Sequence, residues 1–436
     1  NKRAALLETV RRGYVKLIRG TYLIDLDKRG EKVQRQQDLP KEAFATFEEL
    51  QSTDVEVVAL SYCWCSKGHP DPDRFHLPLV VKMVKAMMAG TYVDGAGFDD
   101  SHGSRHLPWQ LRDAGFTFGA SAVAIFWDFM SLPQAPRQPS EEEVFNRALS
   151  SINGWYGSRC IAKWILKGLP EGLTRAPYDK AGWTCFEWQV ANIVTPPSKM
   201  LVLAGDADEV LIAKEDAYAP DDFIKIALRA SQAGKRSGPM EPDAFDKVLD
   251  GLTFTNGADC GKVKPKYREA FHILVDGATS MSFHGYHMTT GSAEQALKLV
   301  LGRCHHLEAL DLGMNPAWEK GLDALAQAVA AAPCFRTIQL LDLSDNKQVH
   351  GEVGSLSDLK FLHTLNLAFA SKVSGDVMGL APLVKLQQLD LHETRVSGDV
   401  MGLAPLVELD FLDLNKTQVV GDFDALQQQL PKLQNF

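Results

Sequence analysis

Two carboxylates lie in sequence contexts that favour chemistry. Asp128 directly follows Ala120–Trp127, an apolar run of strand length. Its side chain is therefore expected at the carboxyl end of a strand, where open α/β sheets bind ligands. Glu187 follows Trp183 by four residues in the segment GWTCFEW, and in a helix this spacing places a carboxylate beside an indole. Desolvation in such a site would raise the pKa of either carboxyl group, so both are candidate catalytic residues.

The same residues have a structural interpretation, which the sequence leaves open. Asp128 would then cap a loop, and Glu187 would pair with an arginine such as Arg147. In that case the indoles would only fill a core, namely Trp64, Trp127, Trp155 and Trp183.

Three segments of the chain carry a family resemblance: ALSYCW at 59–64, FWDFMSLPQ at 126–134 and GWTCFEW at 182–188. In their order and spacing they resemble the patterns A-L-S-Y-x-W-G, W-I-D-x-x-C-I-N-Q and R-G-W-T-x-Q-E of the heterokaryon-incompatibility (HET) domain. That domain is a distant relative of the TIR domain. The chain departs from the patterns where Cys65 replaces Gly, Pro133 replaces Asn, Ala181 replaces Arg and Phe186 replaces Gln.

The resemblance implies a TIR-like domain and, with it, hydrolysis of NAD. Glu187 would be the carboxylate that stabilises an oxocarbenium-like ribose, with Trp183 and Trp64 as stacking walls for a base. Tyr62 and its neighbour Ser61, at the end of the first strand, would line the crevice or merely close the sheet. Because Phe186 and Ala181 replace polar groups that would orient the carboxylate or bind a phosphate, the sequence favours a non-catalytic pocket over an active one.

Metal and phosphate chemistry have weaker signals. Cys63-x-Cys65 followed by His69 is half of a zinc pattern, but no second ligand pair stands at zinc-like spacing, so no metal is expected. The glycines of 90–97 lack the strand–turn–helix context of a phosphate site. The loop 101–106 would face a phosphate or, as the favoured alternative, simply be a solvated loop. NAD is therefore the one cofactor that the sequence suggests, and it rests on the resemblance alone.

A repeat occupies the last third of the chain. The triplets at 341–343, 365–367, 389–391 and 412–414 read Leu-Asp-Leu or Leu-Asn-Leu at spacings of 24, 24 and 23 residues, and a further copy at 310–312 precedes them by 31. These are leucine-rich repeats, whose units are stable only when stacked. The turn Val-x-Gly-Glu/Asp, as at 349–352 and 373–376, resembles the plant-type variant. The ladder asparagines Asn315 and Asn346 give way later to Ala or Thr, which is expected to loosen the array.

The middle residue of each triplet is expected on the concave face of the array. This column is mostly acidic, and neighbouring carboxylates about 4.8 Å apart repel one another unless a cation or basic partner neutralises them. Small or polar flanking residues would keep the groove accessible. The predicted partner-binding residues are Asp311, Asp342, Asn366, Asp390, His392 and Asp413. The alternative is that the acids simply remain solvated.

The alternation of strands and helices predicts a parallel, doubly wound α/β sheet. We expect a helical extension over 1–54, a HET/TIR-like (flavodoxin-like) α/β domain over 55–205, a helical connector over 206–302 and the repeat domain over 303–436. Strands are expected at Val55–Tyr62, Ala120–Trp127, Cys160–Leu166 and Met200–Ala204. The expected helices are Leu77–Met88, Glu141–Trp155 with Ser140 as N-cap, Cys185–Ile193, Asp221–Ala233, Pro242–Leu249 and Lys266–Val275.

Composition excludes some classes of function. A net charge of −9 argues against a general nucleic-acid binder, and no apolar run approaches the ~20 residues of a membrane span. Seven scattered cysteines are typical of free thiols in a reducing, intracellular compartment. The basic first twenty residues predict an amphipathic helix with an apolar face at Leu6, Leu7, Val10, Tyr14 and Leu17. It would pack on the domain or, alternatively, contact a membrane surface.

Together these features predict a protein-recognition or scaffold protein. The repeats would bind a protein partner with a basic surface, and the α/β domain would act as a signalling or structural module. The alternatives are an enzyme of the NAD-hydrolase class and a structural subunit of a larger assembly.

Overall fold

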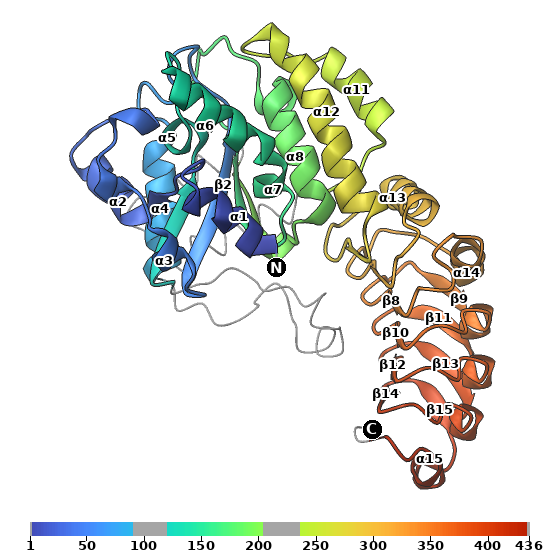
Figure 1. Ribbon diagram of the computed structural model, residues 1–436. Coiled ribbons are helices and arrows are strands. Elements are labelled where there is room, and N and C mark those ends of the chain that lie inside the picture. Colours follow the sequence, from blue (N-terminus) through green and yellow to red (C-terminus); the bar gives the residue numbers. More distant parts are fainter. Residues whose placement is uncertain (1, 90–119, 204–235, 434–436) are drawn as a thin grey trace. The chain divides into compact units, whose positions relative to one another are not determined.

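The computed structural model describes residues 2–89, 120–203 and 236–433 (Figure 1). The described residues form two compact units, one comprising 2–89, 120–203 and 240–271 and the other 236–239 and 272–433. The predicted connector is thus divided between them, with 240–271 in the first unit and 272–302 in the second. The loop predicted over 90–105, with both candidate phosphate loops, and the helix predicted over 221–233 lie outside the described residues.

A five-stranded sheet forms the centre of the first unit. Its order is β1 (Ile18–Arg19), β3 (Ala122–Phe126), β2 (Val55–Tyr62), β4 (Ala162–Leu166) and β5 (Met200–Leu203). β1 pairs antiparallel with β3, and the other pairs are parallel. All eight residues of β2 are buried, as expected for a central strand covered on both faces. The predicted parallel α/β sheet is present, and β2 is the strand at which its order reverses.

Helices cover both faces of this sheet (Figure 1). α2 (Gly20–Lys28) and α4 (Leu77–Ala89) share one core with the sheet. A Cβ atom at Gly20 would lie 2.6 Å from a Val84 methyl carbon and 3.1 Å from the Val123 carbonyl oxygen, so only glycine permits this approach. On the opposite face, α7 (Ile152–Tyr156) stacks the Trp155 ring on Phe126 at 5.1 Å.

The remaining helices of the first unit correct several predicted boundaries. α6 (Pro139–Ser150) begins at a capping box between Gln138 and Glu141, so Ser140 is not the N-cap. α8 (Gly182–Val194) starts three residues before the predicted helix. α11 (Pro242–Asp250) lies close to its prediction, whereas α12 (Cys260–Phe271) begins well before it and accommodates Pro265 inside the helix. A π-helical turn, His272–Asp276, follows α12.

The predicted N-terminal basic helix is too long. α1 (Lys2–Arg11) ends before Gly13, whose φ of +73° turns the chain toward β1. Beyond Arg11 the chain therefore leads into β1, which pairs with the sheet, instead of continuing the predicted helix. The Arg3 guanidinium donates to three backbone carbonyls, those of Leu50, Ser52 and Val55. Leu6 and Leu7 are buried, so α1 packs on the unit as the first alternative predicted. α3 (Phe47–Leu50) follows a capping box at Thr46. None of the described helices is long and apolar enough to cross a membrane.

The second unit is a leucine-rich-repeat solenoid, as predicted. Its main parallel sheet contains β6 (Ser280–Ser282), β7 (Ala309–Asp311), β8 (Leu340–Asp342), β10 (Thr364–Asn366), β12 (Gln388–Asp390) and β14 (Phe411–Asp413). Leu310, Leu341, Leu365, Leu389 and Leu412 pair in one register. β6 extends the array by one strand beyond the predicted start at 303, because Met281 takes the place of a leucine in that strand.

The return segments complete each repeat (Figure 1). A second parallel sheet contains β9 (His350–Glu352), β11 (Lys372–Asp376), β13 (Arg395–Asp399) and β15 (Gln418–Val420). The helical segments are α13 (Thr290–Arg303), α14 (Leu322–Ala330), the 3-10 turns Val353–Leu356, Val377–Leu380 and Val400–Leu403, and α15 (Phe423–Gln429).

Backbone geometry explains the recurrent Val-x-Gly-Glu/Asp turn. Gly398 has a φ of +103°, and a Cβ atom there would lie 2.2 Å from Oδ1 of Asp376 in the preceding repeat. Oδ1 of Asp376 in turn accepts a hydrogen bond from the Met378 backbone N–H at 2.8 Å. The glycine and the acid are therefore both needed to stack one turn on the next.

The strand register of the repeats leads to a prediction about stability. Leu389 is fully buried, and Leu389→Ala is expected to lower the free energy of unfolding by about 2–5 kcal/mol because it removes core contacts and leaves a cavity. Val407, which is 47% exposed on the same array, is the control, and Val407→Ala should cost less than about 0.5 kcal/mol. Urea unfolding of the three proteins measures both. Equal, small costs would contradict this register.

Candidate functional site

The first two HET-like segments meet at Asp128, at the start of α5 (Asp128–Ser131). The Tyr62 hydroxyl donates to Oδ1 of Asp128 at 2.7 Å, and the Trp64 indole N–H donates to Oδ2 at 3.0 Å. The backbone N–H of Phe129 also donates to Oδ1, at 2.7 Å. Both carboxylate oxygens thus accept hydrogen bonds, which is the pattern that suits an ionised, acceptor-only group.

The third segment meets the same strand end through Glu187 on α8. The Ser61 hydroxyl donates to Oε2 of Glu187 at 2.5 Å, and the Tyr178 hydroxyl lies 2.6 Å from the Ser61 oxygen. Successive side chains of a strand point to opposite faces of the sheet. Ser61 and Tyr62 therefore hold Glu187 and Asp128 from one strand end. The structure brings Tyr62 and Trp64 to Asp128, and it places Glu187 on the neighbouring Ser61.

Burial shifts the protonation of both carboxyl groups. It raises the pKa of Glu187 to about 8, and the nearby Asp128 acts in the same direction, against hydrogen bonds from Ser61 and Tyr156. Burial also raises the pKa of Asp128, opposed by the hydrogen bonds from Tyr62, Phe129 and Trp64. Near neutral pH, Glu187 therefore holds a proton. A neutral acid donates a proton to a leaving group, whereas the predicted role required an anion.

Trp183 has a different position from the predicted one. Its indole N–H donates to Oδ2 of Asp259 at 3.1 Å, and its ring contacts Phe186 edge-on. The indole is therefore engaged next to α12 and not with Asp128. The helical spacing to Glu187 was predicted correctly, but spacing alone does not set where a ring points.

The structure also tests the purely structural interpretation, in which Glu187 pairs with Arg147 and the indoles fill a core. Arg147 lies 3.9 Å from Glu143, so it is not the partner of Glu187. Trp127 and Trp155 are fully buried and belong to the core, as that alternative held. Sequence reasoning missed Tyr156 and Tyr178, because neither lies in a segment of the resemblance and no local pattern distinguishes their hydroxyls from those of other tyrosines.

The half-pattern of zinc ligands does not assemble. Nε2 of His69 lies 2.9 Å from the Val33 carbonyl oxygen, and its Nδ1 accepts from the Asp71 backbone N–H at 3.0 Å. Burial raises the pKa of the Cys63 thiol to about 11 and that of Cys65 to about 12, which keeps both protonated. In the part of the chain that the structure describes, no group of three or more His, Cys, Asp or Glu side chains is arranged to hold a metal ion.

The acidic column of the repeats is largely buried, which corrects the prediction of an open groove. Asp311 accepts from the Ser282 hydroxyl at 2.8 Å and lies 3.2 Å from Nδ1 of His284. Asp342 accepts from the Ser344 hydroxyl at 2.7 Å and from the Asn366 amide at 3.0 Å. The carboxylates are thus satisfied within the array and require no external cation at these positions.

Accessibility returns toward the last repeat. Asp342 is fully buried and Asp390 is 4% exposed, whereas the Asp413 side chain is 25% exposed. Nδ1 of His392 lies 3.6 Å from Asp413, and the His392 backbone N–H donates to Asp390 at 3.0 Å. Burial and the neighbouring carboxylates Asp413 and Asp342 raise the pKa of Asp390 to about 7. The accessible part of the predicted column is therefore its C-terminal end.

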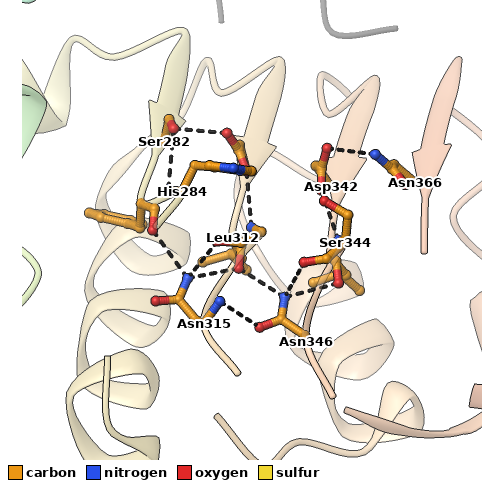
Figure 2. Close-up of polar contacts among 12 residues, drawn as sticks. Ser282, His284, Leu312, Asn315, Asp342, Ser344, Asn346 and Asn366 are labelled. Carbon is orange, nitrogen blue, oxygen red and sulfur yellow. Dashed lines mark hydrogen bonds and ion pairs between the residues drawn. The ribbon is translucent and has the colours of Figure 1, made fainter. Parts of the chain in front are cut away.

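The asparagine ladder joins the first repeats of the same unit (Figure 2). The Asn346 amide donates to the carbonyls of Leu312, Leu343 and Ser344. Thr394 replaces this with one bond to the Leu391 carbonyl, at 2.7 Å. Later repeats therefore have fewer such bonds, in the direction that the sequence predicted.

No protein-family model and no curated protein matches this chain. Solved structures with some similarity are repeat proteins. An internalin from Listeria monocytogenes is 13% identical with a TM-score of 0.31, over 65% of this chain and 76% of that one. A leucine-rich-repeat protein from Leptospira interrogans is 14% identical with a TM-score of 0.30, over 64% and 61%.

A plant peptide hormone receptor is 21% identical with a TM-score of 0.26, over 31% of this chain and 21% of the receptor. This chain thus matches about a fifth of the receptor's length. Similarities this low carry no argument about function. The leucine-rich-repeat fold rests on the strand register described above.

The raised pKa of Glu187 makes stability depend on pH. In the folded protein the Glu187 carboxyl keeps its proton up to about pH 8. In the unfolded chain it loses the proton near pH 4.5. Stability contributed by this group is therefore highest in acid and falls as pH rises through that window. Glu187→Gln removes the titration, so its melting temperature relative to wild type should rise between pH 5 and pH 8.5. The exposed Glu143→Gln is the control, and a pH-independent difference for Glu187→Gln would refute the shifted pKa.

Proposed function

We propose that this chain is a protein-recognition protein, in which the repeat array binds a protein partner. The observation that carries the proposal is the single register of the repeat strands, which stacks equivalent side chains about 4.8 Å apart along one surface. Such a surface recognises an extended or folded polypeptide through many small contacts. The first unit would serve as the signalling or structural module. The free cysteines fit a reducing, intracellular compartment.

The C-terminal end of the acidic column is the proposed contact region. Asp390, His392 and Asp413 lie next to one another there, and Asp413 is the most accessible of the three. Among the described residues, the Asp390 carboxylate accepts a hydrogen bond only from the His392 backbone N–H. A guanidinium or ammonium group of a partner would supply the missing counter-charge. The partner would therefore present a basic surface.

This region can be tested with a defined basic probe. We expect an arginine-rich dodecapeptide to bind the full chain, and Asp390→Asn with Asp413→Asn to weaken binding at least tenfold and flatten its salt dependence. Titration calorimetry at several ionic strengths measures both. Asp358→Asn with Asp424→Asn, at two exposed aspartates elsewhere in the repeat unit, is the matched control because it makes the same chemical change. If the double variant binds as wild type does, the proposed contact is wrong.

A second candidate function is that of a HET/TIR-like enzyme acting on NAD. The observation that favours it is that the three segments meet at the end of β2 in two neighbouring hydrogen-bonded groups, Tyr62 and Trp64 with Asp128 and Ser61 with Glu187. As whole residues, Asp128, Glu187 and Trp64 are half-buried. They are therefore less enclosed than the fully buried Ser61 beside them.

Nicotinamide release tests this second candidate. Incubation of the full chain with NAD should liberate nicotinamide, and Glu187→Ala should abolish the release while the protein stays folded by circular dichroism. The reason is that the side chain would interact with the reacting ribose, and alanine cannot. Turnover that persists unchanged in Glu187→Ala would place the chemistry elsewhere.

A further inference from the structure

The two carboxyl groups at the end of β2 have opposite environments. Asp128 accepts from two N–H groups and one O–H group, spread over both of its oxygens. Among the residues that the structure describes, the Glu187 carboxyl hydrogen-bonds only with hydroxyl groups, those of Ser61 and Tyr156. In the described residues no lysine or arginine forms an ion pair with Glu187. Hydroxyls can accept as well as donate, so this environment accommodates a neutral acid, whereas that of Asp128 suits an anion.

Such a pair divides acid and base roles between two neighbouring carboxyls. The neutral group can give a proton to a departing atom, and the ionised group can take one from an attacking water. Trp64, whose N–H is fixed to Asp128, brings an aromatic ring to the same place. An aromatic ring beside an acid–base pair suits a substrate that contains a flat base next to the bond to be cleaved.

The leaving group decides which substrate benefits from this arrangement. Nicotinamide is attached to ribose as a cation and leaves as a neutral molecule, so it needs no proton from the enzyme. A purine leaves as an anion unless it is protonated during cleavage, so a neutral acid lowers its barrier. The environment of Glu187 therefore favours the purine over the nicotinamide.

We propose that this cluster hydrolyses N-ribosidic bonds of purine nucleosides or nucleotides, with Glu187 as general acid and Asp128 as general base. The bond between the ribose C1′ and the base nitrogen breaks, and the base takes the proton of the Glu187 carboxyl. Water forms the new bond to C1′ and gives a proton to Asp128, from which it returns to Glu187 through solvent. The products are the base and ribose from a nucleoside, or the base and ribose phosphate from a nucleotide, with water as the only co-substrate and no oxidant. This inference rests on the enzymatic candidate and refines its substrate class.

The experiment compares leaving groups on the same sugar. The full chain is incubated with inosine and with nicotinamide riboside, and in parallel with AMP and NAD, between pH 5.5 and pH 9, and free bases are measured by chromatography. We expect purine release, faster at pH 6 than at pH 9, and little nicotinamide. Glu187→Gln should lower purine release about 100-fold, the contribution typical of general acid catalysis. Glu143→Gln, an exposed glutamate on α6, should behave as wild type.

Each outcome decides the inference. Nicotinamide release that depends on Glu187, rises toward pH 9 and occurs without purine release would overturn the purine assignment and leave the NAD candidate standing. Purine release that is unchanged in Glu187→Gln would overturn the acid role. Absence of both bases would overturn the inference together with the enzymatic candidate, while the peptide titration tests protein recognition separately. The wild-type pH profile needs no variant, so a poorly folded variant cannot hide the result.

Discussion

The burial of β2 on both faces is the constraint on which the first unit depends. All eight of its residues are buried, and it pairs with β3 on one side and β4 on the other. The strand therefore fixes where its neighbours end. Its last two side chains, Ser61 and Tyr62, necessarily point to opposite faces. One strand end thus holds Glu187, which comes from a helix, and Asp128, which follows a neighbouring strand, at distances that no local pattern in either segment sets.

In the solenoid, aligned aspartates bring buried negative charges close to one another. Its strand register places Asp311, Asp342 and Asn366 side by side, where like charges repel. Residues of the array itself satisfy these carboxylates. Ser282 and His284 hydrogen-bond Asp311, and the Asn366 amide donates to Asp342. The amide at 366 interrupts the run of acids, so it donates where another carboxylate would repel. Asp413 accepts hydrogen bonds from the Asn415 backbone N–H and amide, but its side chain is 25% exposed, so the column becomes accessible there.

The sequence predicted the repeats well because their signal is periodic, and a stacked register follows directly from period and leucine spacing. It predicted that Asp128 follows a strand at the edge where open α/β sheets bind ligands, and that Glu187 lies on a helix, but not that the two meet at the end of β2. It could not predict where Trp183 points, since the contact with Asp259 joins residues 76 positions apart. Nor could it foresee β1, because a two-residue strand has no period and exists only through its pairing with β3.

Burial of the acidic column also escaped prediction, for a physical reason. An alternating pattern assigns residues to faces of a strand, but it does not say what satisfies them. For Asp342, that depends on a serine two residues later and an asparagine one repeat away. The alternating pattern therefore predicts which face of the strand an aspartate occupies, but not which groups will hydrogen-bond its carboxylate.

The two carboxyl systems differ in how the cost of their burial is offset. Burying a carboxylate costs several kcal/mol unless its hydrogen bonds are restored. In the array this cost is offset by donors from the same or the neighbouring repeat, and Asp342 has no exposed surface, so its role is complete within the fold. Asp128 and Glu187 take their donors from several distant segments and, as whole residues, are half-buried. A fold that needed only stability would be served as well by apolar residues there. The retention of two unlike carboxyl environments at one strand end is the reason to look for a substrate at this place.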